Sequence, residues 1–381
     1  MDFRFTATQE ELYERVLTFA RRELNEGLAE RERARVFPRA AWLRAGELGL
    51  AGLCIPEAYG GMGLDALSSA RLVEALGKGC EDGGLVFGLA AHLFACAEPI
   101  CRYAQEDLRR RVVPGLASGR LIGANAATEA EAGSDIHAIA CRAERVGDDY
   151  VLTGEKSYVT NGPVADVFLV YASTNPRHGY LGLSAFVVER GAEGLEVGRP
   201  FDTLGLVSAP LGPVYLRECR VPAAQRLGEE GQGSVIFAGS MRWERACLFA
   251  GYVGMLERQL ESTTRYAQER TQRGKPIGAH QAIAHRLVEM KVRLEAARLL
   301  LYRACWLIDQ GEDATEAVAM AKLAVSEAAV QSSLDAVQVH GASGVIRDVG
   351  VERMLRDALP STIVSGTSEI QRNIIASLMG L

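Results

Sequence analysis

One acidic residue, Glu244, stands in surroundings that could turn a carboxylate into a base. In the segment SMRWERACLFAG, Met241 precedes it by three positions and Cys247 and Leu248 follow it by three and four, so on a helix its face is otherwise apolar. Burial among apolar groups raises the pKa of a carboxyl and makes Glu244 a plausible proton acceptor, whereas the adjacent Arg245 would oppose that rise. The alternative is a buried Glu–Arg pair with no catalytic part.

A second group of polar residues could contact a flat ligand. The segments NAATEAEAGSD at 125–135 and GEKSYVTNG at 154–162 combine hydroxyl side chains with glycines. Glycine lets a backbone approach a ligand closely, Ser and Thr can orient the edge of the ligand, and an aromatic ring such as that of Tyr158 can pack on its face. The alternative is a pair of ordinary turns, because turns use the same residue types.

The motifs of several other enzyme classes are absent from the sequence. It has no GxxxxGK[ST] phosphate loop, no HExxH and no GxSxG, which disfavours phosphate-loop enzymes, zinc proteases and serine hydrolases. The six histidines are scattered, and the nearest pair, His280 and His285, would lie about 140° apart on a helix, so no metal site is expected. The eight cysteines include no CxxC pair, so neither a zinc site nor a disulfide framework is indicated.

Composition and charge narrow the partners that the protein could have. The chain is 48% hydrophobic and 24% charged, as globular proteins are, and its net charge is −6. An acidic chain is poorly suited to a phosphate backbone, so nucleic acid is not an expected partner. Charges run through the amino-terminal segment MDFRFTATQEELYERVLTFARRELN, which lacks the apolar run of a signal peptide or membrane anchor. We therefore expect a cytoplasmic protein that does not enter a membrane.

Three stretches with different sequence patterns must form the helices and strands that position these residues. Charged–apolar alternation typical of helices comes first, then short β-branched and aromatic runs between turn residues, then helical text again. In the last stretch, apolar residues recur every three or four positions, as in a bundle helix, at Ile283, Leu287, Met290, Leu294, Ala297 and Leu301. The predicted fold class is mainly α with a small central β domain: an N-terminal helical domain (1–118), a central β domain (119–228) and a C-terminal helical bundle (229–381).

Six segments occur together in the order and approximate spacing of a known family: TEAEAGSD, GEKSYVTNG, ERTQRGKPIGAHQAI, QVHGASG, ERMLRDA and SGTSEIQRNII. With IPEAYGGMGL in the first domain, they resemble the acyl-CoA dehydrogenase family of flavoproteins over essentially the whole chain. The resemblance implies a helical domain, a β barrel or sandwich, and a four-helix bundle. Within the family, VFGLAAHLFACAEPI and SMRWERACLFAGYVGMLERQLE most resemble the dehydrogenases that oxidise a prolyl group held as a thioester on a peptidyl carrier protein.

The resemblance implies FAD as the cofactor, bound between the β domain and the bundle, with part of the site supplied by a neighbouring subunit of a homotetramer. The residues of the β domain would border the flavin ring, and those of the bundle the pyrophosphate and adenosine. At three motif positions the chain departs from the family, with Tyr158 in place of Trp, Arg273 in place of Phe and Ala342 in place of a second Gly. The implied cofactor contacts are Asn125, Ala127, Thr128, Ser134, Tyr158, Thr160, Arg270, Gln272, Gln281, Gln338, Gly341, Ala342, Thr367 and Glu369.

The resemblance also bears on the catalytic base. Many members carry it as the Glu of a YEGT motif, but the matching text here is VSGT, with Ser365 at the Glu position. A serine hydroxyl cannot take that proton, so Ser365 is expected to matter little. Other branches, including isovaleryl, long-chain and carrier-protein prolyl enzymes, place a Glu directly before an Arg on a bundle helix, and Glu244 matches it. Ser134, Arg242 and Arg245 are candidate contacts to the substrate.

The implied reaction is FAD-dependent α,β-dehydrogenation of an acyl thioester. L-Prolyl-S-peptidyl carrier protein would be oxidised through a pyrroline to the pyrrolyl-2-carboxyl thioester, with Glu244 taking the α proton and hydride passing to flavin N5. The partners would be phosphopantetheine on a carrier protein, or CoA, and an electron-transfer flavoprotein or O2 as electron acceptor. Bulky residues around the base predict a short acyl pocket: Trp243, Leu248, Phe249 and Tyr252.

Three other functions stay open on the sequence. A short- or branched-chain acyl-CoA dehydrogenase would use the same Glu244. A flavin monooxygenase could be built on the same fold, since the YEGT glutamate is missing. A scaffold or interaction protein that has lost its flavin would need no base at all.

Overall fold

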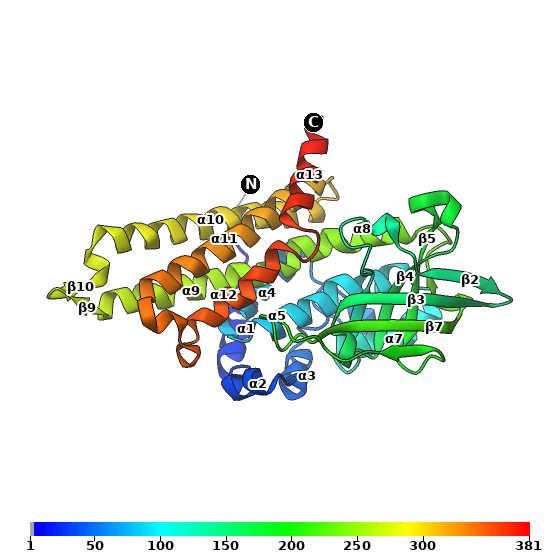
Figure 1. The fold of residues 1–381 in the computed structure, drawn as a ribbon, viewed down its shortest axis with the longest axis horizontal. Coiled ribbons are helices and arrows are strands. Elements are labelled where there is room, and N and C mark those ends of the chain that lie inside the picture. Colours follow the sequence, from blue (N-terminus) through cyan, green and yellow to red (C-terminus); the bar gives the residue numbers. More distant parts are fainter. Residues whose placement is uncertain (1–3) are drawn as a thin grey trace.

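The chain forms a run of helices, then a β-sheet, then a second run of helices, and the sheet lies at one end of the long axis (Figure 1). The structure is a computed structural model that describes residues 4–381. This architecture confirms the predicted fold class, mainly α with a small central β part.

The first run of helices begins at Ala7 and ends at Ala117. Aspartates fix two of its helix starts, because Asp65 accepts a hydrogen bond from the backbone N–H of Ser68 at 2.7 Å and Asp82 from that of Leu85 at 3.0 Å. The helices are α1 (Ala7–Glu23), α2 (Leu28–Ala34), α3 (Arg39–Glu47), α4 (Ala66–Gly79), α5 (Gly83–Ala91), the π-helical segment η2 (His92–Ala97), α6 (Glu98–Tyr103) and α7 (Glu106–Ala117).

One stretch of this part, Gly83–Tyr103, is long and apolar enough to cross a membrane by length and composition. Ninety-four per cent of its most apolar window is buried inside the protein, so its composition is accounted for by its place in the core.

The strands form one mixed sheet in the order β6-β7-β3-β2-β4-β5-β8, and β1 joins it by pairing in parallel with β4. The neighbouring strands β4 and β5 are buried on both faces, which explains their nearly continuous apolar sequences. β1 also packs against η2, which joins the sheet to the first helices. The strands are β1 (Gly123–Ala126), β2 (Arg142–Val146), β3 (Asp149–Thr160), β4 (Val167–Ser173), β5 (Leu183–Glu189), β6 (Leu195–Val197), β7 (Leu211–Pro222) and β8 (Arg226–Leu227).

The second run of helices contains the predicted bundle. In the seam, Met290, Leu294, Ala297 and Leu301 are buried as the spacing predicts. The last helix, α13, projects from the body of the molecule (Figure 1). The elements are α8 (Gly233–Trp243), the π-helical segment η7 (Glu244–Leu248), α9 (Ala250–Glu269), the short hairpin β9 (Thr271–Gln272) and β10 (Lys275–Pro276), α10 (Gln281–Asp309), α11 (Thr315–His340), α12 (Val351–Ala358), the short turn η11 (Leu359–Thr362) and α13 (Ser368–Leu378).

Helices α4 and α9 cross in close contact, which ties the two helical parts together. A Cβ on Gly77 would lie 2.1 Å from the carbonyl oxygen of Gly251, and one on Gly254 would lie 2.0 Å from that of Glu74. Only glycine fits at these positions, because any side chain would collide with the backbone of the facing helix.

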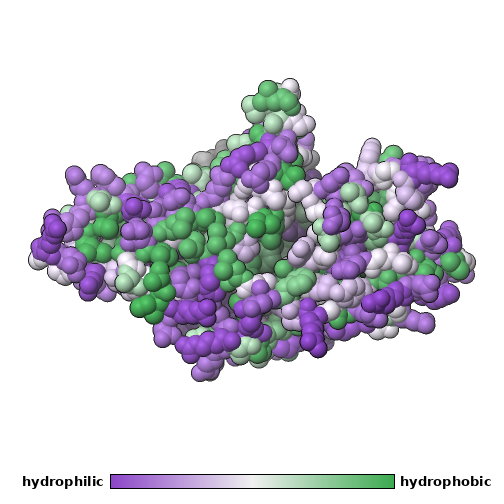
Figure 2. All heavy atoms as spheres, in the orientation of Figure 1, coloured by the Kyte–Doolittle hydropathy of each residue, from purple (hydrophilic) through white to green (hydrophobic). Residues whose placement is uncertain are grey.

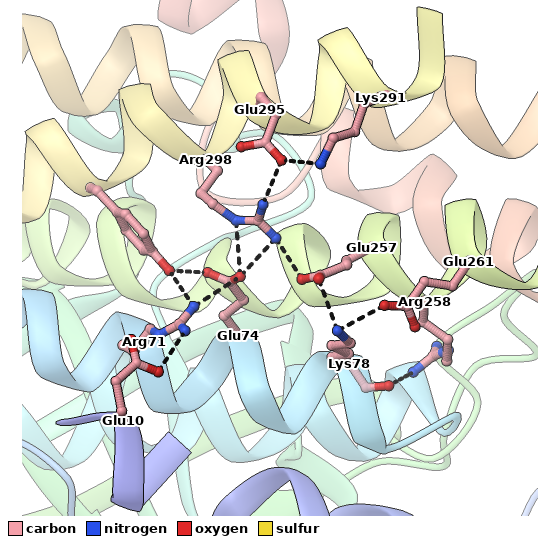
Figure 3. Close-up of polar contacts among 11 residues, drawn as sticks. Glu10, Arg71, Glu74, Lys78, Glu257, Arg258, Glu261, Lys291, Glu295 and Arg298 are labelled. Carbon is pink, nitrogen blue, oxygen red and sulfur yellow. Dashed lines mark hydrogen bonds and ion pairs between the residues drawn. The ribbon is translucent and has the colours of Figure 1, made fainter. Parts of the chain in front are cut away.

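A network of charged side chains fills the space between α4, α9 and α10 (Figure 3). At its centre is Glu74, whose side chain is completely buried and pairs with Arg298 at 3.0 Å. Arg298 also reaches Glu257 at 2.6 Å, and Lys78 reaches the same carboxylate at 2.8 Å. The hydroxyl of Tyr302 donates to Glu74. Because each buried charge has a partner, the network fastens the helices to one another.

Candidate active site

Glu244 lies where the long helix that begins at α8 changes its winding. It is the first residue of η7, a single π-helical segment between α8 and α9, and only 7% of its surface is exposed. A π-helical segment widens the helix by one residue and is frequent at functional sites. The sequence predicted regular helical spacing around Glu244, so burial of the carboxylate is confirmed but the local winding differs from the prediction.

The turn after η11 folds over Glu244. The hydroxyl of Ser365 donates a hydrogen bond to Glu244 Oε1, and the carbonyl of Ser365 accepts one from Arg245 Nε at 2.8 Å. Gln371 Nε2 donates to the carbonyl of Gly366 at 2.9 Å. Ser365 has a left-handed backbone, with φ 58°, so these contacts hold a conformation that a non-glycine residue rarely adopts.

These contacts bear on two points of the sequence analysis. Ser365 was expected to matter little, yet its hydroxyl directly contacts the Glu244 carboxylate; its effect on activity stays a prediction. Arg245 opposes the rise in the pKa of Glu244 as expected, but among the ion pairs within 4 Å between residues 4 and 381, none joins the two side chains. The Arg245 guanidinium instead holds the turn that carries Ser365.

The surroundings of Glu244 have opposing effects on the pKa of its carboxyl. Burial raises the pKa of its carboxyl above the ordinary value, while the Ser365 hydrogen bond, Arg245 and Lys322 act to lower it. The net effect is a raised pKa. A carboxylate with a raised pKa and a hydroxyl to orient it is suited to accept a proton from a weak carbon acid.

Several polar atoms around this site are buried without a hydrogen-bond partner among the described residues. Asn125 Oδ1 lies on β1, Trp243 Nε1 adjoins Glu244, and Ser368 Oγ and Gln371 Oε1 lie on the first turn of α13. A buried polar atom without a partner is costly to a folded protein. These atoms, on β1, beside Glu244 and on α13, therefore leave hydrogen-bonding capacity for a polar ligand such as the expected dinucleotide cofactor.

In the β domain, the two motif segments are fastened to each other by a buried ion pair. Lys156 Nζ, which is fully buried, lies 2.7 Å from Glu129 Oε1 and donates to the carbonyl of Ala127 at 3.0 Å. Glu129 also accepts from the backbone N–H of Cys141 at 3.0 Å. Thr128 is thereby held between two anchored neighbours, which fits a residue meant to face a ligand.

Tyr158 is turned out of the sheet by a bulge. The register of β3 against β7 shifts between Lys156 and Val159, and Tyr158 has φ 55° and 58% of its surface exposed. A β-bulge re-aims the side chain that it carries. Its ring tilts against that of Phe201 with centroids 5.7 Å apart, leaving a ring face available for a planar group. Of the neighbouring predicted contacts, Thr160 ends β3 and is half-buried, and Ser134 is exposed.

The remaining predicted cofactor contacts separate into two places. Arg270, Gln272, Gln281, Gln338, Gly341 and Ala342 are exposed at the end of the bundle beside β9 and β10, where Tyr266 stacks on His340 with centroids 4.1 Å apart. That end is opposite the sheet (Figure 1). Thr367 and Glu369 instead lie at the start of α13, next to the Ser365 turn, and the Thr367 hydroxyl caps that helix. One chain alone therefore does not bring all the predicted contacts together.

Arg242, the other candidate substrate contact, lies beside a buried acid that sequence reasoning missed. Burial raises the pKa of Glu98 to about 7, and the charges of Arg102 and Arg242 oppose that rise. Arg242 is half-buried, and its Nε has no hydrogen-bond partner among residues 4–381. This Nε thus has a hydrogen bond left to donate.

Lys322 was also missed, although the sequence carried a signal for it. It is one lysine in the apolar segment AVAMAKLAV of α11 and is fully buried. A cation in such a run indicates a buried charge, but only the structure shows that it faces the η7 segment.

Comparison with known proteins gives matches over the whole chain. Models of the acyl-CoA dehydrogenase N-terminal, middle and C-terminal domains match residues 6–120, 124–219 and 231–380. An L-prolyl-[peptidyl-carrier protein] dehydrogenase of Pseudomonas fluorescens is 50% identical over 99% of both chains, and one of Serratia sp. is 44% identical over 100% of this chain and 99% of that one. The structure of PigA with FAD and proline is 44% identical, with a TM-score of 0.98 and full coverage of both chains.

Proposed function

The chain belongs to the acyl-CoA dehydrogenase family, and from that premise we propose that it oxidises an L-prolyl group carried as a thioester on a peptidyl carrier protein, with FAD as its cofactor. The observation that carries the proposal is the buried Glu244 carboxylate under the Ser365 turn, in a chain similar over its full length to two prolyl dehydrogenases. The expected family and the expected oxidoreductase activity are both confirmed by these relatives.

Glu244 is the base in this proposal. A proton α to a thioester carbonyl is weakly acidic, so its removal needs a basic group beside it and hydrogen-bond donors for the charge that develops on the carbonyl oxygen. Glu244 provides the first. The turn offers the second, since the N–H groups of Ser365 and Gly366 donate to no acceptor within residues 4–381. Removing one such donor costs about 10²–10³ in rate in other enzymes.

The chain's residues fit FAD at the boundary of the sheet and the bundle. Asn125, Ala127, Thr128, Ser134, Tyr158 and Thr160 would hold its flavin part, with Thr367 and Glu369 close by. Bound there, FAD supplies an acceptor for the hydride that leaves the substrate carbon next to the α carbon. The exposed residues at the far end of the bundle would serve the dinucleotide part of a neighbouring copy.

Apolar residues that suit contact with a second copy of this chain are exposed on the bundle. Val288, Val292 and Leu299 lie on one face of α10 and are 58, 57 and 49% exposed. Figure 2 shows apolar atoms at the tip of the projecting α13, where Met379 is 64% exposed. Exposed apolar patches mark interaction surfaces. These surfaces support a homotetramer in which copies complete each other's FAD sites.

The residues next to Glu244 favour a small acyl group. Trp243, which directly precedes Glu244, is buried and stacks on Phe94 with centroids 6.3 Å apart. Leu248 and Phe249, further along the same helix, are buried as well. Bulky side chains beside the base leave less room for a long acyl chain than for a five-membered ring. Arg242 and Arg245, on the same helix, would orient the thioester arm, and Ser134 would contact it from the β domain.

The state of the cysteines bears on the compartment in which the protein works. All eight cysteines are free thiols, seven of them buried, which suits a protein of the reducing cytoplasm. Electrons would leave to an electron-transfer flavoprotein or to O2, and reduction of an added flavoprotein compared with uptake of O2 separates the two.

The test compares the purified protein on prolyl-loaded carrier protein and on butyryl-, isovaleryl- and octanoyl-CoA, by kcat/KM. Prolyl carrier protein is expected to be the fastest, with mass spectrometry showing a loss of two or four mass units from the carrier-bound group. A clear preference for a CoA ester would point to a short- or branched-chain acyl-CoA dehydrogenase. Incorporation of oxygen would indicate a monooxygenase, and failure to bind FAD would indicate a scaffold.

A further inference from the structure

Lys322 is a buried cation to which the reaction so far gives no role. It lies on α11, its exposed fraction is 0%, and its Nζ has no hydrogen-bond partner among the described residues. Its ammonium lies over the ring of Phe249, 5.4 Å from the centroid. Lysines are almost never fully buried without a partner, because removing the charge from water is costly. A cost of this kind is retained where the charge acts on something nearby.

The groups around Lys322 belong to the candidate active site. Helix α11 packs against η7, and Phe249, whose ring lies under the ammonium, directly follows η7. The charged groups that act on Lys322 are Arg245 and Glu244 of η7, Glu369 of α13 and Glu327 of its own helix. Of these four groups, Glu244 is the buried acid and Arg245 is engaged with the Ser365 carbonyl. Lys322 thus differs from Arg245 in having no hydrogen bond that would fix or neutralise its charge.

We propose that Lys322 is a positioning residue for the Glu244 base: its buried, unpartnered ammonium holds the Glu244 carboxylate in the charged form that accepts the substrate proton. This inference rests on the proposed role of Glu244. It does not depend on which thioester is the substrate, because it concerns the charge state of the base before any substrate binds.

The balance of charges around Glu244 supports this role. Ser365, Arg245 and Lys322 are the groups that favour the ionised carboxylate, and Tyr171, on β4, is the phenol that in turn feels its charge. Burial opposes ionisation more strongly than any one of the three favours it. Removing one of the two cations should therefore raise the pH at which the base becomes active.

The burial of Lys322 also affects how the stability of the fold depends on pH. Burial lowers its pKa to about 8, and repulsion from Arg245 acts in the same direction. A base whose folded pKa lies below its unfolded value binds fewer protons when folded, so stability rises with pH between about 8 and 10.5. Below that window, the buried charged ammonium lowers the stability of the folded state. Lys322→Met, which keeps the length of the side chain and removes the charge, should therefore not lower the Tm at pH 7.

The experiment measures kcat/KM against pH and Tm for the parent holoenzyme, Lys322→Met, Lys322→Arg and the control Arg110→Met. Arg110 is a surface residue on α7 with 71% of its side chain exposed, so its variant removes one positive charge away from the site. For Lys322→Met, the acid limb of the profile should move up by about one pH unit, as expected for the loss of a neighbouring opposite charge. Lys322→Arg should restore most of that shift, and Arg110→Met should show none.

The outcomes divide cleanly. An acid limb that stays in place in Lys322→Met overturns the proposal. So does a Lys322→Met protein that unfolds, loses FAD or has a lower Tm at pH 7, because Lys322 would then be a structural residue. The profile can be recorded with any thioester that the parent oxidises, so a failure of the prolyl assignment is recognised separately in the parent enzyme.

Discussion

Replacing Ser365 by alanine isolates one contact to the proposed base. The hydroxyl is the one group of the turn that donates a hydrogen bond to Glu244, and alanine keeps the Cβ and the left-handed backbone as they are. A hydrogen bond to a charged group contributes about 1.5–3 kcal/mol. At about 1.4 kcal/mol per pH unit, its loss from the ionised form should move the acid limb of kcat/KM up by about one to two pH units. Within that limb, activity at a fixed pH falls by about 10–100-fold, whereas the plateau changes little.

The assay is the pH profile of kcat/KM on the preferred thioester, with flavin content checked in each preparation. Ser361→Ala is the matched control, because Ser361 is a buried serine of the same segment whose hydroxyl donates to the carbonyl of Ser326, at 3.4 Å, and not to Glu244. Its profile should overlie that of the parent. If the acid limb of Ser365→Ala does not move, or moves down, Ser365 does not support the ionised form of Glu244 and the reading of this turn is wrong.

Three further changes test the site and its framework. Glu244→Gln should keep the fold and FAD yet lose most turnover, since an amide of nearly the same shape cannot accept a proton; normal single-turnover rates would refute the role of Glu244. Lys156→Met should cost about 3 kcal/mol in urea unfolding and weaken FAD binding, because it leaves the Glu129 carboxylate buried with only backbone donors; an unchanged free energy of unfolding and unchanged FAD affinity would contradict this. Arg298→Met should lower stability by about 3–5 kcal/mol, because Glu74 loses a buried partner, while kcat stays the same in the folded fraction.

Much of the fold could be predicted because it depends on how residue types are spaced along short stretches of the chain. The bundle seam recurs every three or four residues, and Met290, Leu294, Ala297 and Leu301 are buried as that spacing requires. Short β-branched runs predict the β domain, and two of them form β4 and β5, which are buried on both faces. Such patterns carry over to three dimensions because a helix or strand places residues on its faces by a fixed period.

Parts of the site escaped prediction because they depend on partners far away in the chain. Glu129 and Lys156 were assigned to a ligand-binding motif, but they pair with each other and fasten the two motif segments together. Ser365 was expected to matter little, since its hydroxyl cannot abstract a proton, and its contact with Glu244 was invisible until the turn after η11 folded over η7.

The sequence by itself determined the family and the order of the helical, β and helical parts, and it selected Glu244 as the candidate base, because each depends on residue types at fixed spacings along the chain. The tertiary structure alone decided what surrounds that carboxylate: the π-helical winding at η7, the Ser365 hydroxyl, and the lone ammonium of Lys322. The physical reason is that a buried charge is governed by burial and by neighbours within a few ångströms. Those neighbours come from α11 and from the turn before α13, which only packing brings to Glu244.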